Sequence, residues 1–188
     1  IFGKKEKNMK LNISVDNLLI YDEEFQYFAD RFVNEIGSNC ATYAVKTMAD
    51  LAAAILKHNA VKFLEICLHG SPGRLYMDNK KGIDGSVFNM IAAANPIFLK
   101  RNARILFDSC RIGEGDIGDK FMDSIGVGML KGKGGIVGAT TVVNQTYPLR
   151  PWVTGAHMLT GGILKVKKYD ESGKLVATRK VDEYGFSM

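Results

Sequence analysis

Two side chains that could carry out nucleophilic chemistry follow two apolar runs of the sequence. His69 comes directly after the run 61–68, and Cys110 follows the run 103–107 by three residues. Cysteine attacks a carbonyl carbon as the thiolate, and a nearby imidazole can take the proton from the thiol. The two residues therefore predict acyl-transfer chemistry, with Cys110 as nucleophile and His69 as general base, provided that the fold brings them together.

Glycines accompany both of these residues. Gly70 follows His69, and Gly113 and Gly115 follow Cys110 just before a predicted helix. At the start of a helix the backbone N–H groups point outward, and the helix dipole favours negative charge. We therefore expect the N–H groups of Gly70 and Cys110 to hold the oxyanion that forms when an acyl carbon is attacked.

The pattern of apolar residues predicts elements that could position this pair. Continuous apolar runs are typical of strands buried on both faces, and three- to four-residue spacing indicates helices. Strands are predicted over 41–45, 61–68, 103–107, 136–141, 162–169 and 174–181, the last two as a hairpin, and helices over 23–36, from Thr47 and Asp50 onward, from Ser86 to 95, and over 116–130. Alternating strands and helices predict an α/β fold with a mostly parallel sheet covered on both faces. Ligands bind such sheets beyond the carboxyl ends of the strands, where His69 and Cys110 both lie.

Composition indicates one globular domain over residues 11–188 after a basic N-terminal tail, residues 1–10. The chain has 188 residues, 46% of them hydrophobic and 24% charged, and it has no apolar run of the length that a membrane span needs. An odd count of three cysteines argues against a disulfide framework and favours a reducing compartment.

The net charge of +5 owes much to late residues such as Lys165 and Lys167, which we interpret as a solvated basic face. A polyphosphate site is an alternative, and nucleic acid a weaker one because few aromatics are interleaved.

Other residues whose side chains could bind a metal or carry charge have simpler explanations. Cys67 lies two residues before His69, so a metal site of Cys67, His69 and Cys110 is an alternative to a packed thiol. His58 falls at a predicted helix end, where a cation suits the dipole. The glycine-rich segment 131–135 lacks the order of a phosphate-binding P-loop and is predicted to be a turn.

The two segments that carry His69 and Cys110 resemble the caspase-like cysteine peptidases, which include caspases, metacaspases, gingipains, clostripain and toxin autoprocessing domains. Their first signature is an apolar strand ending in His-Gly, here LEICLHGSPGRL over 64–75. Their second is an apolar strand followed by an acidic or amide residue, a small residue and Cys, here RILFDSCRIG over 104–113. The separation, 110 − 69 = 41 residues, is close to the roughly 50 of caspases. Asp108 and Ser109 stand where caspases have Gln and Ala, which is nearer to the metacaspase form.

The resemblance implies a three-layer α/β/α sandwich and peptide-bond hydrolysis by a dyad of His69 and Cys110, without an obligatory metal or cofactor. It implies that Asp108 lies in the pocket for the side chain before the cut, which favours Arg or Lys there. By position, the other wall of that pocket comes from residues 140–146, which begin with Thr140 and Thr141. The expected partner is a protein or peptide substrate, the parent chain itself included, and neither nucleic acid nor a membrane. Activation by inositol hexakisphosphate or calcium is left open. The location is also left open between the cytoplasm and, for a secreted effector, the cytosol of a host cell.

Two rival functions stay open at this point. One is a peptidase-like binding or scaffold domain without turnover. The other is a flavodoxin-like module that binds a phosphate ligand and in which Cys110 has no role. Modification of Cys110 by a thiol electrophile, dependent on His69, separates catalysis from both rivals.

Overall fold

The computed structural model describes residues 13–77, 82–141 and 164–181 of the chain. Its main feature is a sheet of seven strands, β2 (Asn17–Asp22), β3 (Cys40–Val45), β5 (Val61–Cys67), β8 (Leu99–Phe107), β9 (Gly135–Thr140), β10 (Leu164–Tyr169) and β11 (Leu175–Val181). The order across the sheet is β11-β10-β9-β8-β5-β2-β3. The strands from β9 to β3 are parallel, whereas β10 runs antiparallel to β9 and forms a hairpin with β11. The predicted mostly parallel α/β sheet with a C-terminal hairpin is confirmed.

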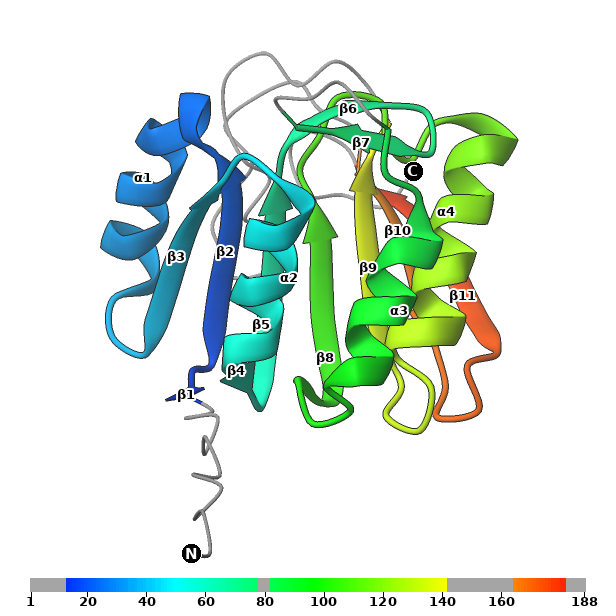
Figure 1. Ribbon diagram of the computed structural model, residues 1–188. Coiled ribbons are helices and arrows are strands. Elements are labelled where there is room, and N and C mark those ends of the chain that lie inside the picture. The colour runs from blue at the N-terminus through cyan, green and yellow to red at the C-terminus, as the bar shows by residue number, and fades with distance from the viewer. Residues whose placement is uncertain (1–12, 78–81, 142–163, 182–188) are drawn as a thin grey trace, which may run out of the picture.

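Helices cover both faces of this sheet (Figure 1). They are the short 3₁₀ helix η1 (Glu23–Phe25) and the helices α1 (Gln26–Ile36), α2 (Met48–Lys57), α3 (Gly85–Ala94) and α4 (Gly115–Met129). α1 packs on one face, where Phe32 stacks on Phe63 of β5, and the helices α2, α3 and α4 pack on the opposite face. Among the described residues, no helix combines the length and apolar character needed to cross a membrane.

Two short strand pairs lie outside the main sheet. β1 (Ile13–Ser14) pairs with β4 (His58–Asn59), and β6 (His69–Ser71) pairs with β7 (Arg74–Tyr76). Figure 1 shows β6 and β7 crossing the edge of the sheet at which β5, β8 and β9 end. We call this edge the rim.

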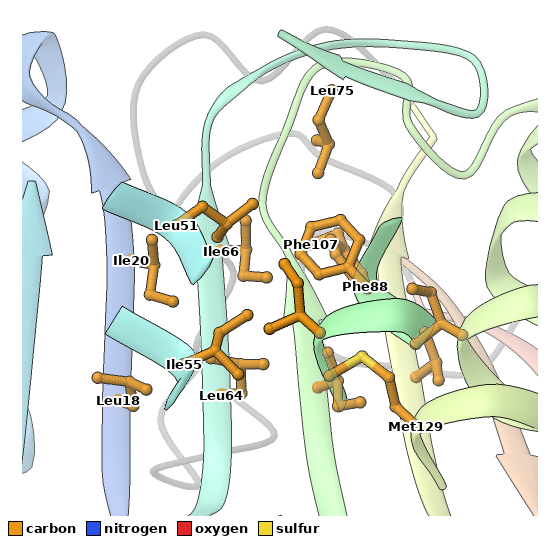
Figure 2. Packing of buried hydrophobic residues seen from close by; sticks show 14 of the residues in the cluster. Leu18, Ile20, Leu51, Ile55, Leu64, Ile66, Leu75, Phe88, Phe107 and Met129 are labelled. Carbon is orange, nitrogen blue, oxygen red and sulfur yellow. The ribbon is translucent and has the colours of Figure 1, made fainter. Parts of the chain in front are cut away.

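The larger core lies between the sheet and the helices α2, α3 and α4. Ile20 of β2 and Ile66 of β5 are fully buried and face Leu51 and Ile55 of α2, as Figure 2 shows. Burying one such side chain contributes about 1.5–3 kcal/mol relative to leaving it in water. The middle of the sheet is therefore a rigid base for the residues at the rim.

Aromatic contacts fix the end of β8. The ring of Phe107 meets those of Phe88 and Phe121 edge-on, with ring centroids 5.5 and 4.8 Å apart. Such pairs contribute about 0.5–1.5 kcal/mol beyond the area they bury. They anchor the strand three residues before Cys110.

Local capping interactions explain where the helices begin and end. Thr47 and Asp50 form the predicted capping box of α2, in which each side chain accepts a hydrogen bond from the other's backbone N–H. Gly37 ends α1 with a φ of 75°, as expected. The predicted cap of α3 is wrong by two residues, because Asp84 is the cap and accepts from the N–H of Ser86 at 2.9 Å.

The sequence pattern missed one central strand and shortened another. β2 lies between β3 and β5, yet its apolar stretch is brief and runs into the acidic residues of η1, which resemble a helix start. β8 begins at Leu99 rather than at 103, and the apolar pattern missed its start because residues 100–102 are polar. Asn102 adopts a φ of 57°, and the ladder with β5 shifts register in this part of the strand. β2 lies beside β5, which precedes His69, and β8 itself precedes Cys110.

Part of the predicted basic face is buried. Lys165 and Lys167 of β10 are only 7% and 4% exposed, and their ammonium groups lie 3.1 and 2.8 Å from the carboxylate of Asp119. Lys167 and the hydroxyl of Tyr169 also reach Asp123, at 2.8 and 2.7 Å. Burial and the bond to Asp123 raise the pKa of Tyr169. These side chains join β10 to α4, so the interpretation of both lysines as solvated is wrong.

His58 is also not the exposed helix-end cation that its position suggests. It is 1% exposed, with Nδ1 3.1 Å from the carbonyl oxygen of Ile13 and Nε2 2.9 Å from the hydroxyl of Tyr43. Burial lowers its pKa, more than the bond to Ile13 raises it, and the nearby Lys57 lowers it further. The folded chain therefore keeps this ring neutral.

We expect the free energy of unfolding to fall on acidification through pH about 6.5, the ordinary pKa of imidazole. The unfolded chain binds a proton on His58 in this range, whereas the folded chain, with its lowered pKa, does not. The contribution of the neutral His58 ring to the free energy of unfolding is thus complete above that pH and is lost as the pH falls below it. Urea unfolding on either side of this pH should show the loss, with a shallower dependence in His58→Gln. An equal dependence in the variant would contradict the assignment.

Candidate active site

The ends of β5 and β8 meet at the rim. The two strands are parallel neighbours, with Ile66 paired to Phe107. Beyond this pair, the N–H of Asp108 donates to the carbonyl oxygen of Ile66 at 2.9 Å, and the N–H of Leu68 donates to Oγ of Ser109 at 3.3 Å. The hydrogen bonds between these strand ends thus continue to the residues directly before His69 and Cys110.

The backbone of Gly70 lies directly against that of Cys110. A Cβ atom at Gly70 would be 2.8 Å from the carbonyl oxygen of Cys110, 3.2 Å from its nitrogen and 2.9 Å from Cβ of Ser109. Side-chain Cβ atoms essentially never approach other atoms below 3.0 Å. Only glycine allows this contact, which brings the His-Gly and Ser-Cys segments together.

A tight turn presents Cys110 between β8 and α4. Arg111 adopts a φ of 55°, which is uncommon for a residue other than glycine and turns the chain sharply after the cysteine. The N–H of Gly113 donates to the carbonyl oxygen of Thr140 at 2.7 Å, and α4 begins at Gly115. Cys110 is partly exposed at this turn.

His69 is exposed at the rim and is held by two residues of η1. Its Nε2 lies 3.1 Å from Oε2 of Glu24, and its ring lies against that of Phe25 with centroids 4.9 Å apart. Half of the His69 side chain is exposed to solvent. An imidazole with one nitrogen bound to a carboxylate has a fixed orientation, and its second nitrogen is left for proton transfer.

Sequence reasoning missed Glu24 and Phe25. They follow β2, which the sequence pattern did not identify, so nothing placed them at the same rim as His69. The signal that could have located them is the run of apolar residues 18–21 followed directly by acidic ones. A strand prediction there would have put Glu24 beyond its carboxyl end.

Comparison of the sequence with models of known protein families gives no match. The search of curated proteins also finds no matching relative. The proposed function therefore rests on the geometry of the rim.

The residues predicted to form a substrate pocket are largely enclosed. Asp108 is 2% exposed and Thr140 is fully buried. The hydroxyl of Thr140 donates to the carbonyl oxygen of Ser109 and accepts from its N–H, so Thr140 supports the turn before Cys110. Thr141 is half-buried and directly follows β9, and Thr140 pairs with Leu164 at the start of β10. The remainder of the predicted wall, 142–146, lies outside the described residues.

A separate pocket of about 340 Å³ lies between the β6–β7 turn and the helices α3 and α4. Its lining includes Arg74, Lys120 and the hydroxyl-bearing Ser86. Asp108, Thr140 and Thr141 do not line it. It is therefore distinct from the predicted substrate pocket.

The other two cysteines do not join this site. Cys67 is 3% exposed and packs in the smaller core on the α1 side, and the thiol of Cys40 donates to the carbonyl oxygen of Gly37 at 3.2 Å. Among the described residues, the His, Cys, Asp and Glu side chains close enough to share a metal ion are those of Asp22, Glu24 and His69. The alternative metal site with Cys67 is thus not formed.

Proposed function

We propose that the protein is a cysteine endopeptidase of the caspase-like kind, with Cys110 as nucleophile and His69 as general base. The observation that carries the proposal is the contact of Gly70 with the backbone of Cys110, which only glycine permits. The seven-stranded sheet with helices on both faces supports it, because both residues follow strands at one rim.

Glu24 gives His69 the tautomer that the reaction needs. A carboxylate only accepts hydrogen bonds, so the proton lies on Nε2 facing Oε2 of Glu24 and leaves Nδ1 unprotonated. Nδ1 takes the proton of the Cys110 thiol, and the thiolate attacks the peptide carbonyl carbon. The imidazolium that forms is stabilised by Glu24 and gives its proton to the leaving amine.

Backbone groups at the rim balance the charge of the intermediate. The carbonyl oxygen becomes an oxyanion on attack, and the N–H groups of Gly70 and Cys110 are its proposed donors. When the amine leaves, the acyl group remains as a thioester on Cys110. Water activated by His69 then hydrolyses the thioester and restores the thiol.

Labelling by a peptide-based thiol electrophile tests the proposal. We expect a peptidyl chloromethyl ketone ending in Arg to modify Cys110, with Cys40 and Cys67 unmodified in the intact-mass spectrum. Digestion of a positional peptide library should then give cleavage of one defined bond type. Equal, slow modification of the cysteines without cleavage would favour a scaffold or ligand-binding role instead.

Asp108 is the residue proposed to select the substrate. A buried carboxylate two residues before the nucleophile attracts a cationic side chain and disfavours an acidic one. We therefore propose cleavage after Arg or Lys in a protein or peptide, the parent chain included.

Asp108→Asn should lower kcat/KM for Arg and Lys substrates by about 10- to 100-fold, the value of a hydrogen bond to a charged group. The same change at Asp116, an exposed residue in the first turn of α4, serves as the matched control and should leave kcat/KM unchanged. Thermal unfolding of both variants separates lost recognition from lost stability. Preference for Asp at the cut in the unaltered protein would contradict the assignment.

A further inference from the structure

Three metal-ligating side chains meet at the rim beside the proposed dyad. Asp22 ends β2, Glu24 lies in η1 and His69 opens β6, and one ligand atom of each lies within 4.8 Å of the other two. The sheet creates this group, because Tyr21 and Cys67 are partners across β2 and β5 just before Asp22 and His69. We call Asp22, Glu24 and His69 the rim triad.

The spacing of the rim triad is close to what a single cation requires. Ligand atoms about 2.0–2.1 Å from a tetrahedral Zn²⁺ lie about 3.4 Å from one another. Nε2 of His69 and Oε2 of Glu24 are 3.1 Å apart, and the Asp22 oxygen has to approach them by at most about 1.4 Å. Glu24 can make much of that adjustment, since 71% of its side chain is exposed.

The rim triad has one fixed carboxylate and one fixed ring. Asp22 is 7% exposed, and its Oδ1 accepts a hydrogen bond from the N–H of Glu24 at 3.1 Å. The ring of Phe25 lies against the His69 imidazole. Surrounding groups that orient ligands in this way raise metal affinity, and removing them typically costs about 10- to 100-fold.

The donor set selects a particular class of cation. One imidazole nitrogen and two carboxylate oxygens, with a fourth position open to water, suit Zn²⁺. Calcium takes six to eight oxygen ligands and magnesium prefers an octahedron of oxygens, so neither suits this group. We infer that the rim triad binds Zn²⁺ and that the bound ion switches off the peptidase, an inference that rests on the function proposed above.

Inhibition follows from which nitrogen of His69 the cation occupies. Without metal, the proton lies on Nε2 facing Glu24, and Nδ1 can accept the thiol proton. Zn²⁺ binds the lone pair of Nε2, so the single proton of the neutral imidazole moves from Nε2 to Nδ1. The ring can no longer accept a proton from Cys110, which stays a thiol. Removal of the ion restores the active tautomer.

Calorimetric titration of the metal-free full chain with Zn²⁺ tests the site independently of catalysis. We expect one ion per chain and a Kd raised at least about 10-fold by Glu24→Gln and by Asp22→Asn. The matched control is Glu23→Gln, because Glu23 is a neighbouring acid that pairs with Lys46 at 2.7 Å and does not belong to the rim triad. Cys110→Ser should retain the affinity, which excludes a thiolate ligand.

The rate of Cys110 labelling, measured in the same titration, tests the switch. It should fall as the Zn²⁺ site fills, recover with a chelator and stay unchanged in excess Ca²⁺. Equal Zn²⁺ affinity in the unaltered chain and in Glu24→Gln would overturn the inference, as would labelling that continues with the site filled. If the protein cleaves peptides but binds no Zn²⁺, the metal site is wrong and the proposed peptidase function still stands. If the chain binds one Zn²⁺ but shows neither labelling of Cys110 nor cleavage, the metal site stands and the proposed peptidase function is wrong.

Discussion

Replacing His69 by alanine should lower kcat/KM by about 10²- to 10⁴-fold, the contribution of a general acid–base residue in a positioned site. In the proposed mechanism the imidazole takes the thiol proton and returns it to the leaving amine, so its loss should slow acylation as well as deacylation. Cys110→Ser should remove covalent labelling altogether, because the hydroxyl is a far weaker nucleophile without a stronger base. Steady-state cleavage of a peptide ending in Arg and intact-mass labelling measure the two effects.

The matched control for Cys110 is Cys40→Ser. Cys40 lies in β3, and its thiol bonds to the carbonyl oxygen of Gly37, away from the rim. This variant should keep full labelling and turnover. Labelling of Cys110 that persists at the same rate in His69→Ala would show that the thiol reacts without the imidazole, and the proposed dyad would then be wrong.

Substituting Gly70 by alanine should lower kcat/KM by about 10²-fold while the chain remains folded. The added methyl would lie 2.8 Å from the carbonyl oxygen of Cys110 and 2.9 Å from Cβ of Ser109, so the two segments must move apart. A displacement of about 1 Å at a reacting group typically costs this much in rate. Overpacking of this kind costs about 1–3 kcal/mol of stability.

Gly37→Ala separates the effect on the site from a general loss of stability. Gly37 has a φ of 75°, and no atom lies within 4 Å of the place that an alanine methyl would take, so alanine there is strained without touching the rim. It should lower the unfolding midpoint and leave kcat/KM unchanged. Full activity in Gly70→Ala would mean that close approach of the two backbones is not needed for catalysis.

The sequence predicted the strands that carry His69 and Cys110 because both are nearly continuous apolar runs, interrupted by Lys62 and Glu65 in the first and by Arg104 in the second. Such runs are typical of buried parallel strands, so it could be predicted from the sequence that their ends meet at one rim. The contact through Gly70 could be predicted only in part, because the His-Gly pair indicates a close approach of the backbone but does not say which atoms it approaches. Whether these residues catalyse a reaction stays a prediction.

Other features depended on contacts that no local pattern contains. Glu24 was missed because β2 is short and precedes a run of acids. His58 was misjudged because the helix-end rule ignores Ile13 and Tyr43, which enclose the ring from distant parts of the chain. Lys165 likewise has the sequence context of a solvated lysine until the partner on α4 is known.

The pairing of Thr140 with Leu164 has a consequence for how the protein can vary. The six antiparallel pairs from Thr140–Leu164 to Gly135–Tyr169 hold the end of β9 beside the start of β10. The free energy of joining two points already fixed in space rises only slowly with the number of residues between them, by about 0.6 kcal/mol for each doubling. A change in the number of residues between β9 and β10 should therefore leave these pairs in place and shift the unfolding midpoint little.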